Sequence, residues 1–148
     1  MEKITTILAK KEPHFHTISP LSSVATALNQ MCCENVDYLV VIGENESFLG
    51  LISEHDIASR VIASNKVLSK TKVGEVMNKR LPVATTGDSV EKCIQLMRQH
   101  QIRHLPVFEN FLFKGIVSSE DMLDEMLCHR TEVFDDEPGR IGRFGLLT

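Results

Sequence analysis

Two short motifs contain the residues with the clearest capacity for chemistry. Residues 50–56 read Gly-Leu-Ile-Ser-Glu-His-Asp, and residues 115–121 read Gly-Ile-Val-Ser-Ser-Glu-Asp. Each motif ends an apolar, strand-like run and opens a helix-like one. The polar residues at this junction are a serine and, three positions later, an aspartate: Ser53 with Asp56, and Ser118 with Asp121. Such a carboxylate can accept hydrogen bonds from the two hydroxyls of a ribose, and a serine beside free backbone N–H groups suits a phosphate or ribose oxygen.

The same spacing also suits a helix cap that binds no ligand. A serine at the N-cap position accepts a backbone N–H from the first helical turn, and an acidic residue three positions later can bond back to the N-cap. A carboxylate in the first turn also interacts favourably with the helix dipole. The residues of the motifs therefore leave two interpretations open, ligand binding and helix capping.

No arrangement of residues indicates catalysis. The sequence contains no Gly-x-Ser-x-Gly nucleophile motif, and no Ser-His-Asp set can be assigned. His55 and Asp56 form an adjacent acid/base pair, but neighbours at the start of a helix point in different directions. We therefore expect no catalytic residues and no enzymatic activity.

The cysteines and histidines do not indicate a metal site. Four cysteines are present, and their spacing matches neither a zinc ribbon nor a redox Cys-x-x-Cys pair. Cys93 lies on an apolar helix face and is interpreted as core filling, whereas Cys32 and Cys33 are interpreted as free thiols. His14 and His16 share a face of an extended segment, but no third ligand is nearby, so we interpret them as surface loop histidines.

The motifs belong to a unit that occurs twice in the chain. At an offset of 66 residues (24 to 90), an apolar helical pattern with the spacing i, i+3, i+4, i+7 recurs. The two sets are Val24, Ala27, Leu28 and Met31, and Val90, Cys93, Ile94 and Met97. Ser22 or Ser23 can cap the first helix, and Asp88 or Ser89 the second.

Apolar runs around polar turns follow each of these helices and predict hairpins. Residues 38–42 and 48–52 flank the turn 43–47, and residues 105–108 and 111–117 flank the turn 109–110. Further helices are expected after each motif, so each unit is strand, helix, strand, strand, helix. This pattern predicts an α/β (α+β) fold.

The organisation along the chain follows from the repeat. We expect a first repeat at 1–65, a polar linker at 66–72, a second repeat at 73–128 and a flexible tail at 129–148. At the start of the two repeats, Ile4, Ile7 and Leu8 match Val73, Val76 and Met77. The tail combines acidic residues with a Gly/Arg-rich stretch, and its end at 144–147 could dock on the apolar groove of a partner chain.

Composition narrows the class of protein. A chain of 148 residues with 43% hydrophobic content can bury one sizeable core, about 68–70% of its unfolded surface. A net charge of −4 without a basic stripe disfavours nucleic-acid binding. Neither a signal peptide nor an apolar run of about 20 residues is present, so we expect a cytoplasmic protein that does not enter a membrane.

The doubled motif, the run Ile-Arg-His-Leu-Pro-Val at 102–107 and the Val-x-x-Val-Met opening at 73–77 resemble paired CBS domains. Such pairs also occur in inosine monophosphate dehydrogenase and in the gamma subunit of AMP-activated protein kinase. The resemblance covers roughly residues 1–128. It implies two repeats packed through their sheets by a pseudo-twofold axis, two clefts that often hold adenosyl ligands, and further pairing into homodimers.

The resemblance also implies that each cleft is built from both repeats. Ser53 and Asp56 would then face Val83, Thr85, Arg103 and His104. A guanidinium there can pair with phosphate oxygens. Ser118 and Asp121 would face Ile18, Ser19, Asp37 and Tyr38. The carboxylate of Asp37 would repel a phosphate, so the cleft of Asp56 is expected to be the nucleotide site.

We therefore expect a regulatory module without a required cofactor. It would bind AMP, ADP, ATP, NAD or S-adenosylmethionine between its repeats and signal energy or metabolite state to an unidentified protein target. The alternative is a homodimeric scaffold that binds no ligand, in which the Ser-x-x-Asp motifs only cap helices.

Overall fold

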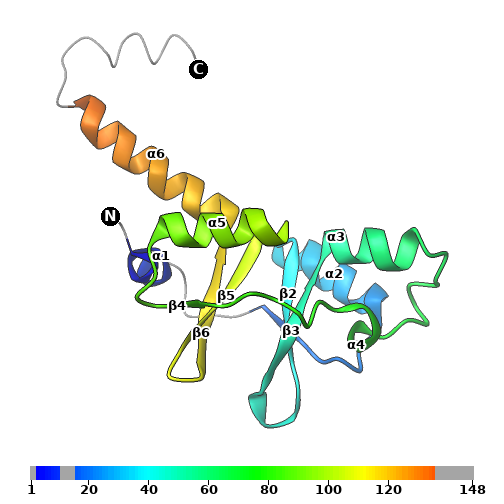
Figure 1. Ribbon diagram of the computed structural model, residues 1–148. Helices are drawn as coiled ribbons and strands as arrows, with labels where there is room; N and C mark the ends of the chain where they lie inside the picture. The colour runs from blue at the N-terminus through cyan, green and yellow to red at the C-terminus, as the bar shows by residue number, and fades with distance from the viewer. Residues whose placement is uncertain (1–2, 11–15, 136–148) are drawn as a thin grey trace, which may run out of the picture. The chain divides into compact units, whose positions relative to one another are not determined.

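The computed structural model describes residues 3–10 and 16–135 (Figure 1). The chain forms two compact units. The N-terminal unit comprises residues 13–81, and the C-terminal unit comprises residues 1–12 together with residues 82–148. His14 and the predicted docking segment at 144–147 lie outside the described residues.

The N-terminal unit contains one three-stranded sheet in the order β1-β2-β3. Strand β1 is parallel to β2, and β2 is antiparallel to β3. Its elements are β1 (Thr17–Ile18), α2 (Val24–Glu34), β2 (Tyr38–Ile42), the 3-10 turn η1 (Glu44–Glu46), β3 (Phe48–Ser53), α3 (Glu54–Ile57), the π-helical turn η2 (Ala58–Ile62) and α4 (Val73–Val76).

The C-terminal unit repeats this plan with a sheet in the order β4-β5-β6. Its elements are α1 (Ile4–Lys10), β4 (Ala84–Thr85), α5 (Val90–His100), β5 (His104–Glu109), β6 (Leu112–Ser118) and α6 (Ser119–Asp135). Each unit thus contains a strand, a helix, two strands and a helix in chain order, which confirms the predicted α/β fold.

The short helices that open the two sequence repeats are exchanged between the units. Ile4 and Ile7 of α1 belong to the apolar core of the C-terminal unit, and the Ile4 N–H donates to Asp88 O at 3.2 Å. Val73 and Val76 of α4 belong to the core of the N-terminal unit. The compact units therefore differ from the predicted sequence repeats at 1–65 and 73–128, because each opening helix packs in the unit formed by the other repeat (Figure 1).

The predicted caps and core positions are confirmed. Ser23 accepts the Thr26 N–H at 3.1 Å and Ser89 accepts the Lys92 N–H at 3.1 Å, so the serine is the N-cap in both helices. Cys93 is fully buried in the core of its unit. Burial, with a further contribution from the charge of Asp88, raises the pKa of its thiol to about 11, so Cys93 is protonated at neutral pH.

Two local expectations were wrong. The second hairpin turns at Asn110 and Phe111, with φ of 50° and 65°, rather than at 109–110, because Glu109 still pairs with Leu112 in the ladder. Helix α6 continues to Asp135, so residues 129–135, which we assigned to a flexible tail, are helical.

Across residues 3–10 and 16–135, none of the helices combines the length and the apolar character that crossing a membrane requires.

Candidate functional site

The first Ser-x-x-Asp motif joins β3 to α3. The Ser53 N–H and the Ser53 hydroxyl both donate to Asp56 Oδ2 at 3.0 Å. In return, the Asp56 N–H donates to Ser53 Oγ at 3.2 Å. These bonds form a reciprocal capping box, and Asp56 is only 8% exposed.

The second motif repeats this arrangement between β6 and α6. The Ser118 N–H donates to Asp121 Oδ2 at 2.8 Å, and the Asp121 N–H donates to Ser118 Oγ at 3.1 Å. Capping is therefore present in both units, as one of the two interpretations requires.

Capping does not use the whole carboxylate of Asp56. Both hydrogen bonds that Asp56 accepts end on Oδ2, and Oδ1 takes none from the part of the chain that the structure describes. A carboxylate oxygen can accept further hydrogen bonds. One oxygen can thus cap the helix while the other receives a ligand hydroxyl, so the two interpretations are compatible.

Strand register places two predicted site residues beside each motif. In the N-terminal unit Tyr38 is the ladder partner of Ser53, and the Glu54 N–H donates to Asp37 O at 3.0 Å. An antiparallel pair brings the start of β2 to the end of β3, which explains why Asp37 and Tyr38 lie next to the motif. Both are half-buried.

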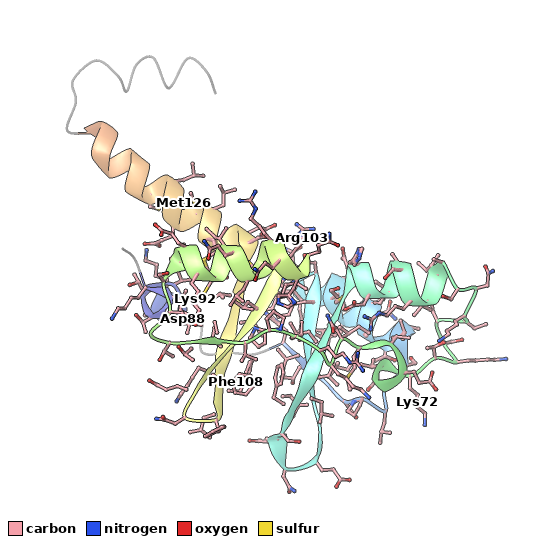
Figure 2. All side chains as sticks on the ribbon, viewed as in Figure 1. Lys72, Asp88, Lys92, Arg103, Phe108 and Met126 are labelled. Atoms are coloured by element: carbon pink, nitrogen blue, oxygen red, sulfur yellow. The ribbon has the colours of Figure 1, made fainter. Side chains whose placement is uncertain are left out.

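The C-terminal unit has the same geometry with different chemistry. His104 is the ladder partner of Ser118, and the Ser119 N–H donates to Arg103 O at 2.9 Å. His104 is buried, whereas Arg103, which follows α5, is exposed (Figure 2). The neighbours are acidic and aromatic at the first motif and basic at the second. The crossed pairing of Asp56 with Arg103, and of Asp121 with Asp37, stays a prediction.

The remaining predicted site residues lie farther along the sheets of their own units. The ladder partner of Ile18 is Val41, three residues beyond Tyr38 on β2, or roughly 10 Å at strand spacing. Thr85 pairs with Phe108 on β5. Phe108 is four residues beyond His104, so these two positions are roughly 13 Å apart at strand spacing.

Ser19 and Val83 flank the short strands β1 and β4. Ser19 follows β1 and accepts the Leu21 N–H on its hydroxyl at 3.2 Å. Val83 precedes β4 and is exposed. Neither residue, nor Ile18 or Thr85, is brought to the Ser-x-x-Asp motif of its own unit.

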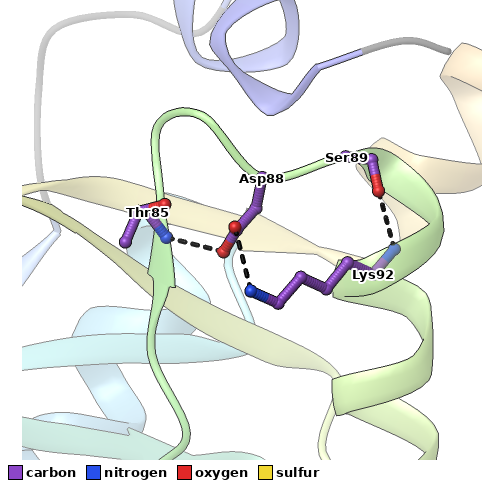
Figure 3. Close-up of polar contacts among 4 residues, drawn as sticks. All are labelled: Thr85, Asp88, Ser89 and Lys92. Carbon is purple, nitrogen blue, oxygen red and sulfur yellow. Dashed lines mark hydrogen bonds and ion pairs between the residues drawn. The ribbon is translucent and has the colours of Figure 1, made fainter.

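Asp88 holds Thr85 through a contact that the sequence did not indicate (Figure 3). Asp88 Oδ2 accepts the Thr85 N–H at 2.9 Å, and Oδ1 accepts Lys92 Nζ at 3.1 Å. Burial by itself raises the pKa of Asp88, but the Thr85 hydrogen bond and the Lys92 ammonium outweigh it and hold the pKa below 3.8. The ionised Asp88 therefore connects β4 to α5. The sequence had identified Asp88 only as an alternative cap.

His16 is half-buried at the entry to β1, whereas we expected an exposed loop histidine. Its Nδ1 lies 3.4 Å from Glu34 Oε1, and its ring meets Tyr38 edge-on at 6.5 Å between centroids. Gln30 donates to Glu34 Oε2 at 2.9 Å and to Thr17 O at 2.8 Å. Among the described residues no group of three His, Cys, Asp or Glu side chains could hold a metal ion.

Comparison with known proteins identifies the family. The family model described as CBS domain matches residues 73–128. The chain is 35% identical over 106 residues to the CBS domain-containing protein YhcV of Bacillus subtilis, covering 72% of this chain and 74% of that protein. This chain belongs to the CBS-domain family. It is also 33% identical over 116 residues to the mitochondrial CBS domain-containing protein CBSX3 of Arabidopsis thaliana, covering 75% of this chain but 56% of the plant protein.

Solved CBS structures share the fold. A protein with CBS domains from Burkholderia ambifaria superposes with a TM-score of 0.80 at 24% identity, over 85% of this chain and 94% of that chain. The hexameric CBS-CP12 protein from bloom-forming cyanobacteria has a TM-score of 0.71 at 27% identity, over 83% and 70% of the two chains. The two curated relatives, YhcV and CBSX3, are named for their CBS domains and not for an enzymatic activity.

Proposed function

We propose that this CBS module binds an adenosyl ligand and regulates a partner protein through that binding. The candidate ligands are AMP, ADP, ATP, NAD and S-adenosylmethionine. The observation that supports the proposal most directly is the capping box at Ser53 and Asp56, in which Asp56 Oδ1 accepts no hydrogen bond from residues 3–10 and 16–135 and can accept one from a ribose hydroxyl. Membership in the CBS family supports a regulatory role.

The charges beside the motifs favour a phosphate near Arg103. Its guanidinium is exposed at the start of β5 and can form bidentate hydrogen bonds to phosphate oxygens. In the crossed arrangement that we propose, Asp37 faces Asp121 and would oppose a phosphate there at short range. We propose that a nucleotide bound through Asp56 uses Arg103 for its phosphate, and that Asp121 receives an uncharged adenosyl group or no ligand.

Calorimetric titration with the five candidate ligands tests this proposal. Asp56→Asn and Asp121→Asn are the informative variants, because an amide oxygen can keep accepting the capping bonds while the carboxylate charge is lost. Ser53→Ala removes the hydroxyl and keeps the carboxylate, so it separates the contribution of the serine to binding from that of the aspartate. We expect affinity to fall in Asp56→Asn and to persist in Asp121→Asn, and a ligand at about 100 times its Kd to stabilise the fold by roughly 2.7 kcal/mol.

The contribution of Arg103 is tested by combining Arg103→Ala with each aspartate variant. Non-additive losses of affinity identify the aspartate that shares a ligand with Arg103. Non-additivity with Asp121 in place of Asp56 would move the nucleotide site to the second motif. If none of the five ligands gave heat or thermal stabilisation, the binding proposal would be wrong.

A second candidate function is a self-associating scaffold. Helix α6 exposes Leu123, Met126 and Leu127 on its surface, and Met126 is labelled in Figure 2. A structural relative is described as hexameric. We propose that the chain forms a homodimer whether it acts as a ligand-binding module or as a scaffold. Sedimentation of Met126→Glu tests this surface: we expect a monomer, whereas an unchanged oligomer would exclude this part of α6 as the interface.

The cytoplasm is the proposed compartment, which imaging of a fluorescent fusion would check.

A further inference from the structure

Arg60 connects the helix that carries Asp56 to the segment through which the chain leaves the N-terminal unit. Its Nη1 donates to Val76 O and to Met77 O, each at 3.1 Å. These carbonyls end α4, where helical carbonyls have no partner within the helix and where a cation is electrostatically favoured.

The next residue of this segment is held by β3. Asn78 N–H donates to Leu51 O at 2.7 Å, and Leu51 N–H donates to Asn78 O at 3.1 Å. Gly50 permits this approach, because a Cβ at that position would lie 2.4 Å from Asn78 O. Residues 76–78 are thus held both by β3, which ends at Ser53, and by the helix that begins at Glu54.

Arg60 lies in the π-helical turn η2, where the Ala63 N–H donates to Ala58 O at 3.0 Å. Such turns are rare and frequently occur at functional sites. The second motif follows the first at an offset of 65 residues, as Gly115 follows Gly50. At this offset Arg60 corresponds to Glu125 in the C-terminal unit. Glu125 of α6 accepts Lys10 Nζ at 2.9 Å, so in both units this position holds an exchanged helix.

We propose that Arg60 is a positioning residue that couples the Ser53–Asp56 site to the segment at 76–78. From this segment the chain runs to Leu81, the last residue of the N-terminal unit, and enters the C-terminal unit at Pro82. A change at the start of α3 then alters how firmly the connection between the units is held. The role of a ligand in this coupling rests on the proposed function, whereas the coupling itself does not.

Hydrogen exchange of the free protein tests the coupling without a ligand. Arg60→Met keeps much of the aliphatic side chain and removes the donors. We expect hydrogen exchange at the Asn78 amide to become about 5-fold faster or more, because measured couplings between sites begin at about this factor. Exchange at the Ala27 amide of α2 should be unchanged. Glu125→Gln, which weakens the corresponding contact in the C-terminal unit, is the matched control and should leave Asn78 unaffected.

The decisive comparison combines Arg60→Met with Asp56→Ala. Asp56→Ala removes the acceptor of both capping bonds, so it should accelerate exchange at Asn78 about 5-fold when Arg60 is present, and should have no effect at Asn78 when Arg60 is replaced. Equal acceleration in both backgrounds, or unchanged Asn78 exchange in Arg60→Met, would overturn the inference.

Titration with AMP, ATP, NAD and S-adenosylmethionine separates this inference from the proposed function. A ligand that binds should protect Asn78 in the wild type, and this protection should disappear in Arg60→Met. Binding without any protection of Asn78 would overturn the coupling and leave ligand binding intact. Absence of binding would refute the proposed function, and the ligand-free comparison would still decide the coupling.

Discussion

Gly50→Ala should destabilise the N-terminal unit through a contact that the sequence alone does not reveal. The added Cβ would lie 2.4 Å from Asn78 O and 3.2 Å from Asn78 C. Both are backbone atoms, so relief requires displacement of the segment rather than rotation of a side chain. The two hydrogen bonds between Leu51 and Asn78 would then be weakened or lost.

The magnitude follows from these two bonds. Each contributes about 0.5–1.5 kcal/mol net, so their loss costs about 1–3 kcal/mol. Replacing glycine by alanine restricts the unfolded chain and returns about 0.4–1 kcal/mol. We therefore expect a net loss centred on roughly 1.3 kcal/mol, within a range of about 0–2.6 kcal/mol, and a central fall in Tm of about 3–5 °C for a chain of this size.

Urea and thermal unfolding followed by circular dichroism measure this effect. Gly87→Ala is the control, because a Cβ at Gly87 meets nothing within 4 Å, and its stability should be unchanged or slightly raised. Hydrogen exchange should locate the loss at the Leu51 and Asn78 amides. If Gly50→Ala were as stable as Gly87→Ala, the argument from the close backbone approach would be refuted.

Three further predictions concern single side chains. Phe111→Gly should stabilise the protein by about 0.5–1 kcal/mol in urea unfolding. Phe111 is fully exposed and has a left-handed φ of 65°, a conformation that is less favourable for a residue with a Cβ than for glycine. A loss of stability would contradict this reasoning. The lowered pKa of Asp88 means that its stabilising contribution is present above about pH 3.8, the ordinary value, and is lost as pH falls through the folded pKa. Asp88→Asn should remove this part of the acid dependence of Tm, and an unchanged acid profile would contradict the assignment. Cys93, with a pKa of about 11, should react with maleimide at pH 7.5 far more slowly than the three exposed cysteines, since the thiolate is the nucleophile; mass spectrometry showing equal labelling would refute its burial.

Local patterns in the sequence were sufficient for the elements of each unit. Helical periodicity located α2 and α5, and the serines at 23 and 89 were among the predicted caps because an N-cap needs only a side chain and its own first turn. The hairpins were also predicted, but the turn at Asn110 and Phe111 was missed by one residue, because a phenylalanine with positive φ is not a turn signal.

The candidate site was predictable in its motifs and not in its surroundings. Ser53 with Asp56 and Ser118 with Asp121 were identified from spacing, since the contacts that position them span only three residues. Their neighbours Tyr38 and the residues at 103–104 depend on strand register, which pairs residues about 15 positions apart.

By itself, the sequence determined that the chain contains two copies of one unit, with a helix after each Ser-x-x-Asp motif, because the periodicity that reveals a helix acts within a few residues. Only the tertiary structure decided that α1 and α4 exchange units, and that Arg60 holds the end of α4. Each of these short helices buries two apolar residues at a spacing of three, Ile4 with Ile7 and Val73 with Val76, and this shared pattern does not specify which core a helix joins. Their placement therefore depends on long-range packing and on hydrogen bonds such as Ile4 N–H to Asp88 O, which no local pattern specifies.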